Sequence, residues 1–470
     1  MDAVQFLSVA LLGYLVFRFT RLLLFSKRHI RLRSAAVLVL GDIGRSPRMM
    51  YHAESLAENN FETYIIGNEV KNPPSIPTLA LVWAVSLWQG NKVIIDWHNL
   101  GYSILALKLG HDHVLVKVAK WFESYFGQKA YAHLFVTNAM KTYLSKEWNL
   151  KGSKVVLHDR PPSHFHKASP SEMHELFVDI KASFDVPALK TFLPRSNSPY
   201  STPFTEVDSA RSPSVSHPLT LEGEYTPYES SSSPMPSKRP DRPALLVSST
   251  SWTPDEDFGL LLQALEMYEV KARKWNASAD PESRLPKVLM VVTGKGPDRD
   301  KYMRQVGKLQ AEWEWVRCIS MWLEPENYPL LLGMLEDFGK FTQNLTLFLG
   351  RRAPDIVGSA DLGISLHSSS SAFDLPMKVV DMFGCGLPVC ALDFACLGEL
   401  VKDGVNGLVF KTPDELADQM ESLLKSFPSS TRLAALRRSL EMDEKSGEWC
   451  SWSQNWNNIM RPLLLRDVHS

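Results

Sequence analysis

The chain opens on one long apolar run that is followed by a basic cluster. Residues 4–25 are mostly apolar, long enough for one helix to cross a bilayer. Arg18 and Arg21 interrupt the run, but long basic side chains can reach the membrane surface. Only Asp2 precedes the run, whereas four basic residues follow it: Lys27, Arg28, Arg31 and Arg33. The positive-inside tendency predicts a transmembrane helix within residues 1–33 and a cytosolic location for the rest. A cleaved signal peptide, the alternative, would carry its charge on the other flank.

Beyond residue 33 the pattern alternates between short aliphatic runs, polar loops and helical stretches. This alternation is typical of βα units on a parallel sheet. In the first half, the predicted strands are residues 35–40, 63–66, 92–95, 133–136 and 154–157. In the second half, they are residues 244–247, 288–292, 316–319, 362–366 and 387–391.

A segment of different composition separates the two halves. Residues 196–243 are dense in Ser, Pro and charged residues and poor in aliphatic ones, so they bury too little surface to offset their ordering entropy. The pattern predicts a disordered linker there. It lies between two doubly wound Rossmann-like domains, residues 34–195 and 244–470, which face a cleft. The fold class is therefore α/β.

Ligands of parallel sheets lie outside the carboxyl ends of the strands, so the loops there are candidate sites. The first such loop has two glycines, which allow close backbone approach, and it precedes a helix whose N-terminus favours anions. We interpret it as a loop for an acceptor diphosphate or sugar, with a plain tight turn as the alternative. Its residues are Gly41, Asp42, Gly44 and Arg45, with Arg48 on the helix. Later first-domain loops add Asp96, His98, Asn99 and Arg160.

In the second domain, three loops are candidates for binding a nucleotide diphosphate. Residues 248–252 include Ser249, Thr250 and Ser251, more hydroxyls than a helix cap needs, although a merely polar turn is the alternative. Thr253 and Glu256 then predict a capping box. Gly294, Lys295 and Gly296 combine close backbone approach with a positive charge. Asp374, Lys378 and Asp381 recur at helical spacing, next to the hydroxyl-rich run that begins at His367. An exposed acid–base face is the alternative interpretation of that spacing.

Composition excludes several other classes of protein. The net charge is −1, so no overall field attracts nucleic acid. The 5 cysteines have no CxxC spacing, which argues against a disulfide framework or a zinc site. His111 and His113 have no evident third metal ligand, and we expect them in a solvated loop.

Several long segments resemble the chitobiosyldiphosphodolichol beta-mannosyltransferases, a family of inverting GT-B enzymes. The most distinctive are GDIGRSPRM at residues 41–49 and DLPMKVVDMFGCGLPV at residues 374–389. Residues 92–110, 158–162 and 248–265 are also similar. The resemblance implies transfer of mannose from GDP-mannose to chitobiosyl-diphospho-dolichol, with inversion and a β-1,4 linkage, at the cytosolic face of the endoplasmic reticulum membrane. The dolichol-linked oligosaccharide serves protein N-glycosylation.

The chain departs from the family pattern in two places. Only residues 68–71 stand where the family has a longer segment, so the first domain is expected to be shortened there. Residues 334–357 interrupt a stretch that is continuous in relatives, which suggests a foreign insertion. The first departure favours an alternative function, a non-catalytic GT-B scaffold that recruits other dolichol-pathway glycosyltransferases.

The resemblance implies that the first domain supplies the catalytic base and that the second domain binds the donor. Asp42 is the first choice for the base that accepts the proton of the acceptor hydroxyl, with His98 and Asp96 behind it. Lys295, Lys378 and residues 249–251 are expected to stabilise the departing GDP, and Asp374 and Asp381 to bind ribose or mannose hydroxyls. No cofactor is expected; a divalent metal is not required for donor binding but can stimulate. Other dolichol-pathway mannosyltransferases are expected partners. Residues 76–88 form either a core helix or a segment that contacts the bilayer.

Overall fold

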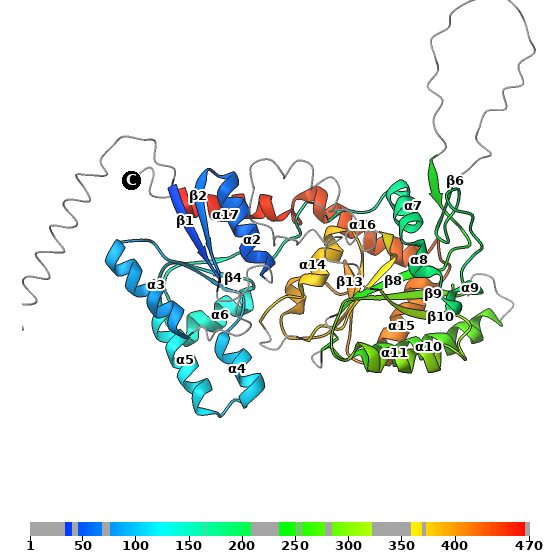
Figure 1. Cartoon of the computed structure of the whole chain (residues 1–470), viewed down its shortest axis with the longest axis horizontal. Coiled ribbons are helices and arrows are strands. Elements are labelled where there is room, and N and C mark those ends of the chain that lie inside the picture. The colour runs from blue at the N-terminus through cyan, green and yellow to red at the C-terminus, as the bar shows by residue number, and fades with distance from the viewer. Residues whose placement is uncertain are drawn as a thin grey trace, which may run out of the picture. The chain divides into compact units, whose positions relative to one another are not determined.

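The computed structural model describes residues 33–39, 46–67, 76–163, 165–207, 235–250, 252–253, 256–277, 284–321, 359–368 and 373–465 (Figure 1). The predicted anchor, the loop at residues 40–45, the shortened segment at 68–71 and the insertion at 334–357 lie outside these residues, apart from Arg33. Within the described part, no helix is both long and apolar enough to span a bilayer. By their contacts the residues group into two units, Met1–Lys71 and Asn72–Ser470, and each is described by itself.

The first unit is one βα unit with a second strand. Strand β1 (Arg33–Leu38) pairs in parallel with β2 (Phe61–Ile66), with Val37 opposite Ile65. Helix α2 (Pro47–Glu58) connects the two strands and begins with Pro47, whose fixed φ suits the first helical turn. The predicted acceptor residue Arg48 lies on this helix and is 5% exposed.

The second unit begins with a three-stranded parallel sheet in the order β3-β4-β5. Its strands are β3 (Ile94–Trp97), β4 (Lys129–Phe135) and β5 (Lys151–Val156). Four helices precede or connect these strands in the sequence: α3 (Ile76–Gln89), α4 (Gly101–Leu109), α5 (Val114–Phe126) and α6 (Asn138–Glu147). A core that includes Trp97, Phe135 and Met140 holds the sheet and α6 together.

Both ends of the predicted linker are ordered, so that part of the linker prediction is wrong. Strand β6 (Thr205–Val207) pairs antiparallel with β7 (Pro236–Lys238). Phe204 is fully buried, and His174 is within hydrogen-bond distance of the hydroxyl of Thr205 at 2.8 Å. Apolar burial and satisfied hydroxyls thus fix these few residues despite the polar composition around them. The preceding short helices are α7 (Pro170–Asp179), α8 (Lys181–Phe184) and α9 (Pro187–Lys190).

The second half of this unit is a six-stranded, all-parallel sheet in the order β10-β9-β8-β11-β12-β13. Its strands are β8 (Ala244–Ser249), β9 (Val288–Thr293), β10 (Val316–Met321), β11 (Leu362–Ser365), β12 (Val389–Leu392) and β13 (Gly407–Phe410). All ten strands predicted from the aliphatic runs are present. β13 was not predicted, because its apolar run is only Leu408, Val409 and Phe410.

Both faces of this sheet are covered, as continuous apolar strands require. Leu246 and Val292 face a core formed with α10 (Phe258–Asn276), α11 (Arg299–Leu309), α15 (Pro413–Leu424) and α16 (Thr431–Ser446). Leu245 and Val291 point the other way, toward α7 and α14 (Met377–Gly384). The 3₁₀ turn η5 (Leu397–Glu399) lies between β12 and β13, and the last described helix is α17 (Trp452–Leu465).

Candidate functional site

Three predicted loops converge at the carboxyl ends of β8, β9 and β11. β8 lies between β9 and β11, so the segments after these three strands are neighbours. The amide of Thr250 donates to the carbonyl of Thr293 at 2.9 Å, and the hydroxyl of Thr293 donates to that of Ser249 at 3.1 Å. Glu256 forms an isolated antiparallel bridge with His367. The residues predicted to bind the donor therefore come together from separate parts of the sequence.

Gly294 is required where two of these loops meet. Its φ is +126°, and a Cβ atom there would lie 1.8 Å from the carbonyl oxygen of Thr250. The indole of buried Trp252 donates to the Gly294 carbonyl at 3.1 Å. The next residue, Lys295, is exposed.

Glu256 links two predicted donor residues, a role that the sequence did not predict. Its carboxylate accepts hydrogen bonds from the Thr250 hydroxyl and from the Lys378 ammonium, and its side chain is 5% exposed. The predicted capping box of Thr253 and Glu256 is wrong, because α10 begins at Phe258. Asp257 caps that helix instead, accepting from the Gly259 amide at 2.9 Å. The available signal in the sequence was a glutamate four residues beyond the candidate phosphate loop at residues 248–252.

The segment before α14 completes the cluster. Helix α14 begins at Met377, so Asp374 lies ahead of it and only Lys378 and Asp381 share the helix. Nε2 of His367 lies 3.5 Å from Oδ2 of Asp374. Lys378 stands on the first turn of the helix, where the backbone amides and the helix dipole favour an anion. Hydroxyls, an ammonium group and a helix N-terminus in one place suit a diphosphate.

The structure describes only some of the predicted first-domain residues. Asp96 lies within β3, not after it, while His98 and Asn99 follow the strand. Nδ1 of His98 is buried without a hydrogen-bond partner in the described structure. The guanidinium of Arg160 lies 4.3 Å from the ring centre of Trp449. Five of the predicted site residues lie outside the described part of the chain: Gly41, Asp42, Gly44, Arg45 and Ser251.

Glu399 joins the two halves of the second unit. Its carboxylate accepts from the amides of Asn138 at 2.7 Å and Ala139 at 2.8 Å, at the start of α6, and lies 3.2 Å from Nε2 of His158. Burial alone would raise the pKa of Glu399, but these hydrogen bonds hold it below its usual range. The Thr137 hydroxyl adds a 2.7 Å bond to the Phe373 carbonyl, beside Asp374. The second-half loop is thereby fixed against the first half.

The Asp381 carboxyl interacts with Asp159, a residue of the first half of this unit. Burial, reinforced by the nearby Asp159 carboxylate, raises the pKa of Asp381 to about 8. The folded chain therefore keeps this carboxyl protonated at neutral pH, whereas the unfolded chain ionises it near pH 4. Because the folded state then binds more protons, this group lowers stability as pH rises from about 4 to about 8.

We expect Asp381→Asn to flatten this part of the pH dependence, because asparagine stays neutral, as the Asp381 carboxyl does in the folded chain at neutral pH. Thermal unfolding between pH 5 and pH 8.5 should show a smaller decline in Tm than in the unchanged protein. Asp300→Asn, at an 80% exposed carboxylate, is the matched control and should leave the decline as it is. Parallel Tm curves for Asp381→Asn and the unchanged protein would contradict the raised pKa.

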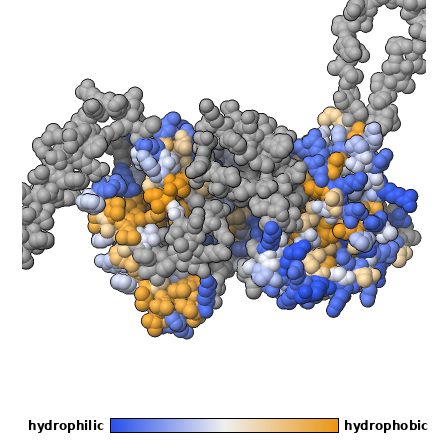
Figure 2. Space-filling view, viewed as in Figure 1, coloured by the Kyte–Doolittle hydropathy of each residue, from blue (hydrophilic) through white to orange (hydrophobic). Residues whose placement is uncertain are grey.

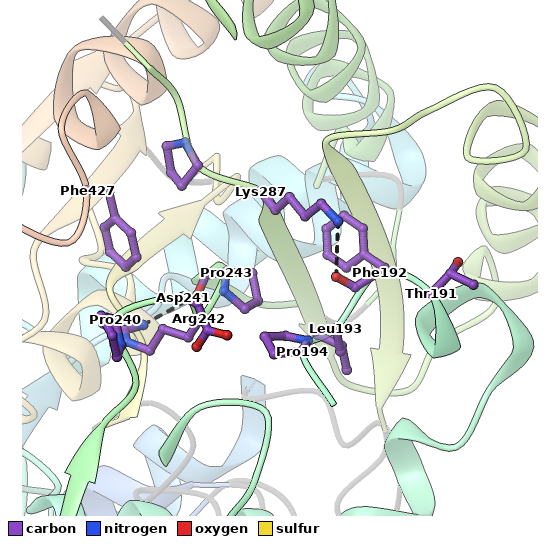
Figure 3. A pocket seen from close by; sticks show the side chains of 11 residues that line it. Thr191, Phe192, Leu193, Pro194, Pro240, Asp241, Arg242, Pro243, Lys287 and Phe427 are labelled. Atoms are coloured by element: carbon purple, nitrogen blue, oxygen red, sulfur yellow. Dashed lines mark hydrogen bonds between the residues drawn. The ribbon is translucent and has the colours of Figure 1, made fainter. Parts of the chain in front are cut away.

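A cavity of about 390 Å³ lies away from this cluster, at the opposite ends of β8 and β9 (Figure 3). Arg242, Lys287 and Phe427 line it, and the Lys287 ammonium donates to the Phe192 carbonyl at 3.4 Å. Since it adjoins the first residues of these strands, it is not part of the donor site. The described residues contain no group of three or more His, Cys, Asp or Glu side chains that could hold a metal ion.

Comparisons with known proteins agree with this geometry. Residues 333–426 match the profile of the family described as "Glycosyl transferases group 1". A mouse protein named chitobiosyldiphosphodolichol beta-mannosyltransferase is 37% identical, over 92% of this chain and 89% of its own length. "UDP-glycosyltransferase TURAN" of Arabidopsis thaliana is 34% identical, over 92% and 97%. The crystal structure of Anabaena Alr3699/HepE in complex with UDP superposes with a TM-score of 0.52 at 13% identity, over 92% of this chain and 99% of that one.

The fold and the clustered loops define a glycosyltransferase of the GT-B class. Within that class, the identity to curated relatives over nearly the whole chain decides the family. The chain belongs to the chitobiosyldiphosphodolichol beta-mannosyltransferase family.

Proposed function

We propose that this protein transfers mannose from GDP-mannose to chitobiosyl-diphospho-dolichol and inverts the anomeric centre, forming a β-1,4 linkage. The observation that carries the proposal is the cluster of Thr250, Glu256 and Lys378 beside Gly294, at the carboxyl ends of parallel strands. The names of the relatives support the acceptor. We place the reaction at the cytosolic face of the endoplasmic reticulum membrane, with residues 1–33 as a single-pass anchor.

In the proposed reaction, the acceptor 4-hydroxyl attacks C1 of mannose from the face opposite the diphosphate. The bond from C1 to the diphosphate oxygen breaks, GDP leaves with the bonding electrons, and a base takes the hydroxyl proton. Asp42 is the proposed base, with His98 and Asp96 as alternatives.

Donor binding is assigned to the second half of the chain. The charges of Lys378 and Lys295 and the amides of the first turn of α14 stabilise the leaving diphosphate. Asp374 and Asp381 are proposed to bind ribose or mannose hydroxyls, and His367 is a further proposed donor-binding residue. Acceptor binding is assigned to six residues of the first half: Gly41, Gly44, Arg45, Arg48, Asn99 and Arg160. No metal is needed for the donor to bind.

Calorimetric titration of the full chain in detergent tests the donor assignment. We expect GDP-mannose and GDP to bind in the presence of EDTA, and UDP-glucose to bind at least about tenfold more weakly, since nucleotide recognition depends on placed polar groups. UDP-sugars are the informative competitors because one relative is named as a UDP-glycosyltransferase. Tighter binding of UDP-glucose than of GDP-mannose would contradict the donor, and loss of binding in EDTA would contradict metal independence.

A further inference from the structure

Glu399, which contacts the start of α6, stands at one end of a short and rigid segment. We call residues 394–399, which end with η5, the η5 segment. The amide of Leu397 donates to the carbonyl of Phe394 at 3.1 Å, and the amide of Glu399 donates to the carbonyl of Cys396 at 3.0 Å. Cys396 and Leu397 are 3% and 1% exposed. Because hydrogen bonds and burial hold the segment in one shape, a shift of Glu399 also displaces Cys396.

The rest of the η5 segment contacts two residues that are proposed to bind the donor. The Cys396 thiol donates to the carbonyl of Asp374 at 3.2 Å. The ring of Phe394 stands edge-on to that of His367, with the ring centres 5.9 Å apart. Nε2 of His367 in turn lies 3.5 Å from Oδ2 of Asp374. The η5 segment thus joins the first half, at Glu399, to this pair of donor-binding residues.

Asp374 is also fixed to α6 through the residue before it. The Thr137 hydroxyl donates to the Phe373 carbonyl at 2.7 Å, and the ring of Phe373 stacks on that of Tyr143, with the ring centres 4.7 Å apart. Asp374 therefore lies where the two halves of this unit meet. A donor sugar must lie within reach of the acceptor, and the acceptor is assigned to the first half. This position suits the sugar of the donor rather than its nucleoside.

The contact between Glu399 and α6 is polar. The carboxylate accepts from the amides of Asn138 and Ala139 and, at 3.1 Å, from the Asn138 side chain. Large exposed apolar side chains of the first half gather over α4 and α5 instead, at the lower end of the view in Figure 2, where Val114 and Trp121 are 70% and 60% exposed. Directional hydrogen bonds to one carboxylate, rather than apolar burial, therefore set the geometry of this contact.

We propose that Glu399 is a positioning residue for the donor sugar. Through the η5 segment it holds Asp374 and His367 where the mannose of the sugar nucleotide meets the acceptor. The inference rests on the proposed function, because it concerns the sugar part of the same donor. Binding of the diphosphate is assigned to Thr250 and Lys378, so the nucleotide without its sugar should not depend on Glu399.

Replacing Glu399 by glutamine separates the sugar from the nucleotide. Glutamine keeps the size of the side chain, but its nitrogen cannot accept from the amides of Asn138 and Ala139. We expect kcat/KM for GDP-mannose to fall at least about tenfold, mainly through kcat, because a displaced sugar is poorly aligned for attack. In calorimetric titration, GDP should bind Glu399→Gln as tightly as the unchanged protein. Weaker binding of GDP by the same factor, or an unchanged kcat/KM, would overturn the proposal.

A double-mutant cycle tests whether Glu399 acts through Asp374. In the Asp374→Ala background, Glu399→Gln should lower kcat/KM much less than it does alone, because the side chain that it positions is gone. Losses that multiply would contradict this role. Glu172→Gln is the matched control at the start of α7, where the carboxylate accepts from the Ser169 amide at 2.8 Å and lies 3.1 Å from Nε2 of His166. It should lower Tm but leave kcat/KM unchanged.

Thermal unfolding without substrate tests the η5 segment independently of the reaction. Cys396→Ala removes the thiol that donates to the Asp374 carbonyl and leaves the contacts of Glu399 in place. The Tm losses of Cys396→Ala and Glu399→Gln should add up to more than the loss of the double variant, because both loosen the same segment. Additive losses would show that the two contacts are independent and would overturn the link. No transfer by the unchanged protein, together with non-additive losses, would count against the proposed function alone.

Discussion

Replacing Asp361 by alanine is expected to lower the free energy of unfolding by about 3–5 kcal/mol, the usual cost of breaking a buried ion pair. Asp361 is fully buried and accepts two hydrogen bonds from Arg242, at 2.6 and 2.9 Å, and one from Arg437 at 3.1 Å. Burial alone would raise the pKa of Asp361, but these cations and Lys238 hold it far below its usual range. Alanine would leave the guanidinium groups of Arg242 and Arg437 close together without the carboxylate that both contact.

The same network ties β8 to β11. A carboxylate oxygen of Asp361 also accepts from the amide of Leu245 at 3.0 Å, next to where the two strands pair. The loss should therefore loosen the strands that carry Thr250 and His367. We expect a lower Tm, faster proteolysis within residues 235–465, and loss of donor binding.

A neighbouring pair provides the control for this prediction. Arg239 and Asp241 make two hydrogen bonds at 2.8 and 2.7 Å, but Asp241 is 57% exposed. Asp241→Ala should cost only about 0–1 kcal/mol, because water replaces the lost contact. Similar losses of stability in Asp241→Ala and Asp361→Ala would contradict the importance of burial.

Replacing Lys378 by methionine is expected to lower kcat about 10²–10³-fold, as removal of one charge-stabilising group does in comparable sites. Methionine keeps the bulk of the side chain but cannot balance the charge of departing GDP. The effect should fall mainly on kcat, because the leaving group carries most charge in the transition state. Initial rates at saturating GDP-mannose measure it.

Glu256 complicates this variant, and a second substitution resolves the difficulty. Lys378→Met leaves the buried Glu256 carboxylate without its ammonium partner, which also lowers stability. Glu256→Gln together with Lys378→Met removes the buried negative charge, so the double variant should regain Tm but not kcat. Lys301→Met on α11 should leave both unchanged. Recovery of the rate in the double variant would exclude Lys378 from stabilising the leaving group.

Strand positions could be predicted because a parallel sheet buried on both faces needs uninterrupted aliphatic runs. Residues 244–247 and 288–292 are such apolar runs, and both are strands. The short β13 was missed, as was the order of residues 205–207 and 235–238 in a polar segment, since their ordering depends on Phe204 and on side-chain hydrogen bonds formed only in the fold.

The site was predictable in part for the same reason. The rule that ligands lie beyond the carboxyl ends of strands brought Thr250, Gly294 and His367 together correctly. Local sequence gave Glu256 a capping role, whereas its real partners are six and 122 positions away. Pairings such as Glu399 with the start of α6 join residues 261 positions apart and leave no local pattern.

The 494 aligned positions with the mouse relative exceed the 470 residues of this chain, so that relative has internal segments without a counterpart here.

The most direct test of the central claim is transfer of mannose from GDP-mannose to a synthetic chitobiosyl-diphospho-lipid by the full chain in membranes, with the mouse relative assayed in parallel. The product is then digested with β-mannosidase and its linkage is determined. We predict a single added mannose that is released by β-mannosidase and joined through the 4-hydroxyl. An α-linked product, or no transfer while GDP-mannose binds and the mouse protein is active, would contradict the proposed function.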